Sequence, residues 1–185
     1  MADLPTCSSV EGKPVISATF DELVSGFVAW VNARPEVCFI VIEGYPQSGK
    51  TPLLKALPDN WAKIEIDDEI PDNSSPDVPW LTLAQQSGVV DKARLLLRDA
   101  PVVAVEGVVA GALFEPLLAE LRGASRRIYV KACSMSSGSP YWVDGAIRDR
   151  QAALVCNEFM RSAIAYHAGE PENAADLILE RLYDE

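Results

Sequence analysis

Residues 44–51 read Gly44-Tyr45-Pro46-Gln47-Ser48-Gly49-Lys50-Thr51, which matches the phosphate-loop pattern G-x-x-x-x-G-K-[ST]. An apolar run at 37–42 precedes the loop and predicts a buried strand, and residues 53–57 predict the start of a helix. This order suits phosphate binding, because glycines let backbone N–H groups turn toward an anion and a helix N-terminus adds partial positive charge. The sequence therefore predicts a nucleoside triphosphate site lined by all eight loop residues.

Two side chains of the loop have predicted roles of their own. We expect Lys50 to reach the β- and γ-phosphates as a catalytic residue, and we expect the Thr51 hydroxyl to bind Mg²⁺. Pro52 follows within the first turn of the predicted helix, where its missing N–H costs little.

The composition is that of a soluble α/β domain. The chain has 185 residues, of which 49% are hydrophobic and 23% are charged. We expect an irregular tail at 1–14 and a single nucleotide-binding domain at 15–185. The formal net charge of −11 argues against a nucleic-acid polymer as partner. No apolar run reaches membrane-spanning length and the N-terminus lacks a signal-peptide pattern, so we expect a cytoplasmic protein without a membrane partner.

The four cysteines do not form a metal-binding pattern. None has C-x-x-C spacing, and the chain has one histidine, His167, so a zinc site is disfavoured and reduced thiols are expected. Cys38 lies in the predicted first strand and is expected in the core. The cysteines are Cys7, Cys38, Cys133 and Cys156.

Acidic residues follow two further predicted strands. Asp67-Asp68-Glu69 come after a strand at 61–66, and Glu106 comes after an apolar strand at 101–105. Open parallel sheets build their sites at the carboxyl ends of strands, so these carboxylates are expected near the phosphate loop. Glu106 either makes a second Mg²⁺ contact or holds a water there, or it merely caps its turn.

A proline-rich segment at 71–79 predicts a long surface loop at the same edge of the sheet. Such a loop either binds substrate or simply connects two elements. Trp80 at its end either stacks on a planar substrate or anchors the loop by burial.

The remaining pattern predicts further helices and one more strand. Thr19 is expected to cap a helix that ends at Arg34. The periodicity of 174–182 favours a last helix. The other predicted elements are helices at 87–99 and 113–122, a strand at 127–131, a low-complexity segment at 134–140 and a long helix at 143–167.

The long helix carries three arginines that could meet a phosphate, Arg148, Arg150 and Arg161. Surface arginines are more often solvated partners of carboxylates, which is the alternative for each of them. His167 lies near the end of this helix, where we expect it to interact with the last carbonyls.

Alternating strands and helices around a phosphate loop specify a doubly wound parallel β-sheet flanked by helices. Three stretches of the chain resemble the uridine kinase-like branch of small P-loop kinases. They are Ile42–Thr51, Ile64–Asp68 and the V-x-x-E-G signature within Val102–Gly107. The resemblance covers residues 37–131, about half of the chain.

The resemblance implies a phosphotransferase that uses ATP and Mg²⁺ to phosphorylate a hydroxyl of a small molecule. Asp67 aligns with the first aspartate of the family and would be the base that orients that hydroxyl. Glu106 would be the third-strand acid near the metal, with Asp68 as a further metal contact. Arg148 would correspond to the arginine that follows the lid arginines of the family, in contact with the nucleotide.

The chain departs from this family at two places. Glu69-Ile70 replaces the usual aromatic pair, and an arginine-dense lid is missing after Val130. The lid and the identity of the acceptor therefore stay open. The resemblance also implies a last strand at 175–179, against the helical periodicity, so that element stays unassigned.

Two functions remain after these observations. One is a small-molecule kinase, whose acceptor could be nucleoside-like, a sugar, a vitamin precursor or a drug. The other is a nucleotide-binding regulatory module with little turnover. Asp67 favours the kinase because a nucleotide sensor needs no second-strand base, and the missing lid favours the module because a kinase must exclude water. We favour the kinase, while the choice of ATP or GTP and the oligomeric state stay open.

Overall fold

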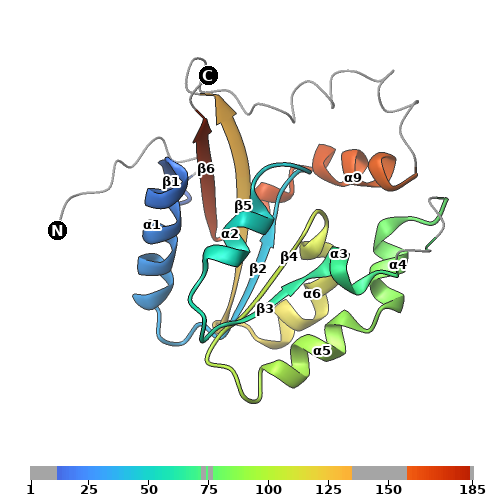
Figure 1. Ribbon diagram of the computed structural model, residues 1–185, viewed down its shortest axis with the longest axis horizontal. Helices are drawn as coiled ribbons and strands as arrows, with labels where there is room; N and C mark the ends of the chain where they lie inside the picture. Colours follow the sequence, from blue (N-terminus) through green and yellow to red (C-terminus); the bar gives the residue numbers. More distant parts are fainter. Residues whose placement is uncertain (1–11, 72–73, 75–76, 135–157, 184–185) are drawn as a thin grey trace.

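A six-stranded sheet forms the centre of the computed structural model, which describes residues 12–71, 74, 77–134 and 158–183 (Figure 1). The strand order is β1-β6-β5-β2-β4-β3, and every neighbouring pair is parallel. The strands are β1 Val15–Ala18, β2 Phe39–Glu43, β3 Ala62–Glu65, β4 Val103–Gly107, β5 Ser125–Ser134 and β6 Leu177–Tyr183.

Helices cover both faces of this sheet, as parallel strands with crossover connections require (Figure 1). On one face α1 and α2 pack on Ile40 and Ile42 of β2, and on the other face α4, α5, α6 and α9 pack on Phe39 and Val41. The helices are α1 Phe20–Asn32, α2 Lys50–Ala56, α3 Ile66–Glu69, α4 Trp80–Gln86, α5 Val89–Leu96, α6 Ala110–Glu120 and α9 Glu158–Ala168, with a 3-10 turn η1 at Pro171–Ala174.

The register places several acidic residues at one edge of the sheet. Glu43 at the end of β2 lies opposite Gly107 of β4, and Glu65 at the end of β3 lies opposite Glu106. Because the three strands are adjacent and parallel, the segments that follow them converge at this edge. The phosphate loop follows β2, and α3 follows β3.

The C-terminal segment is a strand, so the helix that periodicity favours at 174–182 is wrong and the strand that the resemblance implies is confirmed. Strand β6 lies between β1 and β5, with neighbours on both sides. Leu177, Ile178 and Leu179 are all buried, because both faces of this interior strand are covered. Three consecutive buried residues cannot be told from a helical stripe by period alone.

Other elements differ from the prediction in extent. Strand β1 and helix α4 are not in the prediction at all, and the predicted helix at 87–99 is shorter, at Val89–Leu96. Thr19 is the N-cap of α1, but its hydroxyl donates to Glu22 at 2.8 Å instead of accepting a backbone N–H. Cys38 is half-buried and precedes β2, whereas Cys133 is buried.

Part of the prediction lies outside the described residues. This part comprises the predicted tail up to residue 11, Cys7, Cys156, most of the segment at 134–140, and the predicted helix up to residue 157. Among the described helices none is both long and apolar enough to cross a membrane.

Candidate nucleotide-binding site

The phosphate loop connects β2 to α2 and is folded tightly against β5. A Cβ at Gly44 would lie 2.3 Å from the carbonyl oxygen of Val130, so only glycine fits at the first position of the loop. Gly49 has φ of +103° and Gln47 has φ of +68°, both in the left-handed region. Gln47 is not a glycine, and a non-glycine residue with a left-handed backbone is uncommon. Such residues are typical of segments that hold a ligand.

Ser48 gives a second indication that the loop is built for a ligand. Its side chain is buried, and its hydroxyl has no hydrogen-bond partner among the described residues. Buried polar groups are nearly always paired, so an unpaired one in a phosphate loop fits a group that a bound ligand would satisfy.

Lys50 lies inside the loop and closes it. Its ammonium group donates a hydrogen bond of 2.9 Å to the carbonyl oxygen of Tyr45, and only 6% of the residue is exposed. Burial lowers the pKa of Lys50, while the charges of Glu106, Asp67 and Glu43 act in the opposite direction. The charges of three carboxylates therefore act on the Lys50 ammonium group, and two of them, Glu106 and Asp67, are the acids that the sequence analysis singles out.

Thr51 and Glu106 are in direct contact, although they come from different elements. The Thr51 hydroxyl donates a hydrogen bond of 2.8 Å to Glu106 Oε1, and Glu106 is 3% exposed. Burial raises the pKa of Glu106, and the nearby Lys50 charge lowers it. A hydroxyl and a carboxylate are hard oxygen ligands of the kind that Mg²⁺ prefers, so these two residues fit the predicted metal.

Asp67 lies beside this pair but in a helical turn, because β3 ends at Glu65 and α3 follows directly. Its Oδ1 accepts a hydrogen bond of 2.8 Å from Trp80 Nε1. Trp80 is buried, so it anchors the end of the 71–79 loop, and of its two predicted roles burial is the one that the structure supports. Asp67 interacts electrostatically with both Lys50 and Glu106.

Asp68 does not join Thr51 and Glu106 in the structure. It is exposed, and none of the contacts among the described residues links it to either of them. At a strand end, adjacent residues such as Asp67 and Asp68 would point to opposite faces, but the structure does not place them in a strand. Both lie in α3, where successive residues are about 100° apart around the helix axis.

Gly107 allows α3 and α4 to approach the end of β4. A Cβ there would lie 2.8 Å from Ile66 Cδ1 and 3.0 Å from the Trp80 ring. The glycine of the V-x-x-E-G signature therefore gives room to the two elements that hold Asp67.

Of the three arginines of the predicted long helix, Arg161 is the one that lies among the described residues. Arg148 and Arg150 lie outside the described residues. Arg161 forms an ion pair of 2.8 Å with Glu158, one turn earlier on α9, and half of its side chain is exposed. Of its two predicted roles, the surface pair is the one observed.

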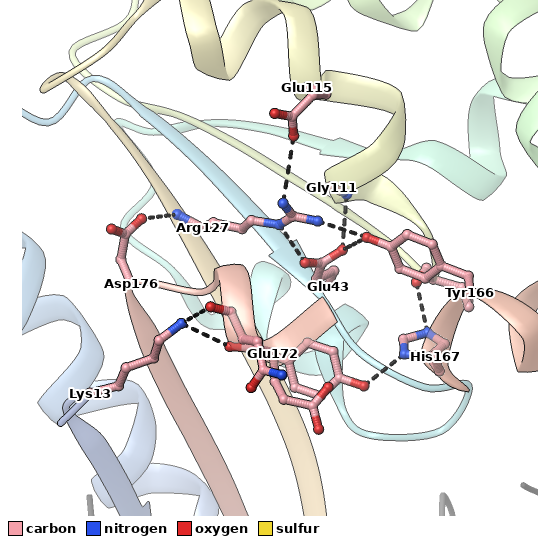
Figure 2. A network of polar contacts seen from close by, with 12 residues as sticks. Lys13, Glu43, Gly111, Glu115, Arg127, Tyr166, His167, Glu172 and Asp176 are labelled. Carbon is pink, nitrogen blue, oxygen red and sulfur yellow. Dashed lines mark hydrogen bonds and ion pairs between the residues drawn. The ribbon is translucent and has the colours of Figure 1, made fainter. Parts of the chain in front are cut away.

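Glu43, directly before the loop, is a functional candidate that the sequence analysis missed. It is fully buried, and Figure 2 shows it at the centre of a polar network. Its carboxylate accepts hydrogen bonds from Arg127 Nε at 2.6 Å, Gly111 N at 3.0 Å and the Tyr166 hydroxyl at 2.7 Å. Burial would lower the pKa of Arg127, but its hydrogen bond and ion pair with Glu43 raise it overall.

The geometry around Arg127 leaves no room for a side chain at Gly111. A Cβ at Gly111 would lie 2.1 Å from Arg127 Nη2, and the same guanidinium donates to the Tyr166 hydroxyl at 2.8 Å. The sequence shows Glu43 at the end of an apolar strand and Arg127 near the start of a strand that also carries Arg126 and Lys131, so neither residue stands out as a partner of the other. Such a pair can be found only once the strands are known to be adjacent.

His167 connects α9 to the phosphate loop, which corrects the prediction that it interacts with the last carbonyls of its own helix. It is 2% exposed, and its Nε2 lies 2.9 Å from the carbonyl oxygen of Val108. Nε2 must donate there, so Nδ1 accepts the bond of 2.7 Å with the Tyr129 hydroxyl. Its ring also meets the Tyr45 ring edge-on at 5.3 Å, and burial lowers its pKa to about 4.

Comparisons with known proteins give a likeness to solved structures. No protein-family model matches the chain, and neither does any curated protein sequence. A solved structure described as a possible uridine kinase from Bacillus stearothermophilus superposes with a TM-score of 0.50 and 14% sequence identity. The superposition covers 86% of this chain and 98% of that one. The chain has a P-loop kinase-like fold. The predicted fold class is therefore confirmed.

Proposed function

We propose that the protein is an ATP- and Mg²⁺-dependent phosphotransferase that phosphorylates a hydroxyl of a small molecule. One observation carries this proposal: Lys50, Asp67 and the hydrogen-bonded pair Thr51–Glu106 converge at the carboxyl edge of β2, β4 and β3. A phosphate-binding cation, a metal-binding pair and a carboxylate for the acceptor are the parts that phosphoryl transfer needs.

The loop and Lys50 bind the phosphates of the nucleotide. Backbone N–H groups of the loop provide donors, and Lys50 exchanges its bond with the Tyr45 carbonyl for the phosphate oxygens. Thr51 and Glu106 would hold Mg²⁺, which supplies positive charge to offset the charge of the phosphates. Burial of Lys50 and Glu106 strengthens these electrostatic interactions, since little water screens them.

Asp67 orients the acceptor hydroxyl. The Trp80 indole occupies Oδ1 and fixes the carboxylate, so Oδ2 can accept a hydrogen bond from the acceptor. The carboxylate would take up the proton as the hydroxyl oxygen attacks the γ-phosphorus of ATP, and the bond from that phosphorus to the β–γ bridging oxygen would break to release ADP. The resemblance to uridine kinase-like proteins places nucleoside-like compounds, sugars, vitamin precursors and drugs among the acceptors to test.

A nucleotide-binding module with little turnover is the second candidate. The observation in its favour is that the sequence after Val130 lacks an arginine-dense lid, which a kinase uses to exclude water from the γ-phosphate. The two functions differ in one measurable respect, because only the kinase transfers phosphate to an acceptor.

A two-stage experiment separates the two candidates. Calorimetry with Mg²⁺ and a non-hydrolysable ATP analogue tests binding first, with Lys50→Met as a control that keeps the buried stem. Thermal-shift screening of a hydroxyl-metabolite library with the same analogue then identifies the acceptor. An acceptor at about a hundredfold excess over its dissociation constant should stabilise the protein by roughly 2.7 kcal/mol. Phosphorylation of that acceptor with ATP supports the kinase, and binding without transfer supports the module.

A further inference from the structure

Arg181 of β6 lies against the phosphate loop, far from it in sequence. A Cβ at Gly49 would lie 2.7 Å from Arg181 Nη1 and 3.0 Å from Arg181 Cδ. The arginine side chain therefore packs on the loop residue that directly precedes Lys50. This contact brings a second side chain with a permanent positive charge to the loop.

The fold holds this side chain in place from three directions. Arg181 lies opposite Ala18 of β1 and Ala132 of β5, whose small side chains leave space over the sheet. Its guanidinium lies over the Phe20 ring of α1, 5.2 Å from the ring centroid. Strand β6 is two strands from β2, about 10 Å away, so only a long side chain can extend from it to the loop.

Arg181 approaches the loop from the side opposite the predicted metal site. Glu106 belongs to β4, on one side of β2, whereas β5 and β6 lie on the other side. A nucleotide whose terminal phosphates lie near Thr51 and Glu106 must place its remaining phosphate and nucleoside elsewhere along the loop. The Arg181 flank offers a cation to that part of the ligand.

We propose that Arg181 is a nucleotide-binding residue that contacts the phosphates of a nucleoside triphosphate from the β6 side of the loop. The inference rests on the proposed function, because it assumes that the loop binds a triphosphate. It deepens that function, since Arg181 supplies a cation in a chain that lacks the arginine-dense lid. A planar guanidinium can donate two parallel hydrogen bonds to a phosphate, which a lysine cannot.

The test compares Arg181→Gln and Arg181→Lys with a matched control, Arg94→Gln. Arg94 lies on α5, where it forms an exposed ion pair of 3.1 Å with Glu120, and its loss changes the net charge equally. Calorimetry measures the dissociation constants of a non-hydrolysable ATP analogue and of inorganic tripolyphosphate, each with Mg²⁺. We expect Arg181→Gln to weaken both ligands by about tenfold, Arg181→Lys to recover part of the loss, and Arg94→Gln to change neither.

Each other outcome overturns a specific statement. Unchanged affinity in Arg181→Gln means that the arginine only packs on the loop, while the proposed function stands. A loss for the ATP analogue without a loss for tripolyphosphate places Arg181 on the nucleoside and refutes the phosphate contact. A wild-type protein that binds neither ligand refutes the proposed function together with this inference. If Arg181→Gln fails to fold, Arg181→Lys alone decides, because weaker binding of both ligands is expected from the lost planar fork.

Discussion

The Thr51 hydroxyl and Glu106 Oε1 lie 2.8 Å apart, joined by a hydrogen bond between the first turn of α2 and the end of β4. This contact connects the phosphate loop to a carboxylate from the neighbouring strand. The interpretation of Glu106 as a residue that merely caps its own turn does not explain a bond to the loop. We propose that Glu106 acts together with Thr51 on a shared ligand.

Glu106→Gln should weaken the use of Mg²⁺ without unfolding the protein. Glutamine keeps the shape and can still accept the Thr51 hydrogen bond, but it lacks the charge that would hold the metal. We expect the Mg²⁺ concentration for half-maximal nucleotide binding to rise several-fold, measured by calorimetry across a Mg²⁺ titration. An unchanged Mg²⁺ dependence would assign Glu106 a structural role only.

Lys50→Met should abolish most triphosphate affinity while the protein stays folded. The amine is buried with a lowered pKa, so its removal relieves a desolvation cost, and methionine fills the space of the stem. We expect affinity for the ATP analogue to fall by at least about tenfold, since a charge-assisted contact to the phosphates is lost. Wild-type affinity in the folded variant, measured by calorimetry, would contradict the assignment.

Asp67→Asn should impair transfer much more than binding. Asparagine retains an oxygen for the Trp80 hydrogen bond, so the turn stays in place, but it cannot take up the acceptor proton. We expect phosphate transfer to fall by at least about a hundredfold, with ATP affinity within a few-fold of wild type. The measurement is steady-state transfer to the acceptor found by screening.

Asp68→Asn is the matched control for this prediction. Asp68 is exposed in the same turn, and no described contact links it to Thr51 or Glu106. Its substitution should therefore leave transfer close to wild type. Equal losses in both variants would mean that the turn, and not the Asp67 carboxylate, matters.

The loop and the strand ends could be predicted from the sequence because their signals are local. A glycine pattern after an apolar strand predicts the loop, and an acid after each of two more strands predicts Glu106 and Asp67. Glu43 and Arg127 could not be paired in this way, since they are 84 positions apart and meet only because β5 lies beside β2. Strand order is a tertiary property that local sequence patterns do not contain. For the same reason, the contact of Arg181 in β6 with Gly49 could not be predicted from the sequence.

Glu43 and Arg127 should stabilise the folded protein as a pair, so that removing one partner costs more than the pair itself contributes. Glu43→Gln leaves the partly buried Arg127 without its main counter-charge, because its other partner, Glu115, is 3.6 Å away and exposed. We expect a loss of about 3 kcal/mol in the free energy of unfolding, by urea denaturation. The double substitution Glu43→Gln with Arg127→Met should cost less than the sum of the single ones, because it leaves no unpaired charge.

A surface pair of similar length is the control for this cycle. Arg126 and Glu36 lie 2.9 Å apart, but half of the Glu36 side chain is exposed. Glu36→Gln should cost at most about 1 kcal/mol, since solvent screens the pair. Equal costs for the two glutamate substitutions would show that the burial of Glu43 contributes nothing.

His167 should make the stability of the protein depend on pH in a defined window. Burial lowers its pKa to about 4 from an ordinary value of 6.5, and it is held neutral between Tyr129 and the Val108 carbonyl. As the pH falls below 6.5, the unfolded chain takes up a proton that the folded protein does not. The stabilisation is therefore complete above about pH 6.5 and is lost as the pH falls toward 4, by about 3 kcal/mol in total.

His167→Gln isolates this contribution, because glutamine offers a donor and an acceptor but does not titrate. Urea unfolding at several pH values between 7 and 4.5 should give a steeper fall for the wild type than for the variant. The wild type and the variant carry the same carboxylates, so the effect of the carboxylates cancels in the difference between the two curves. Parallel curves would mean that His167 is protonated in the folded protein as readily as in the unfolded chain, and that the edge-on contact with Tyr45 does not depend on a neutral ring.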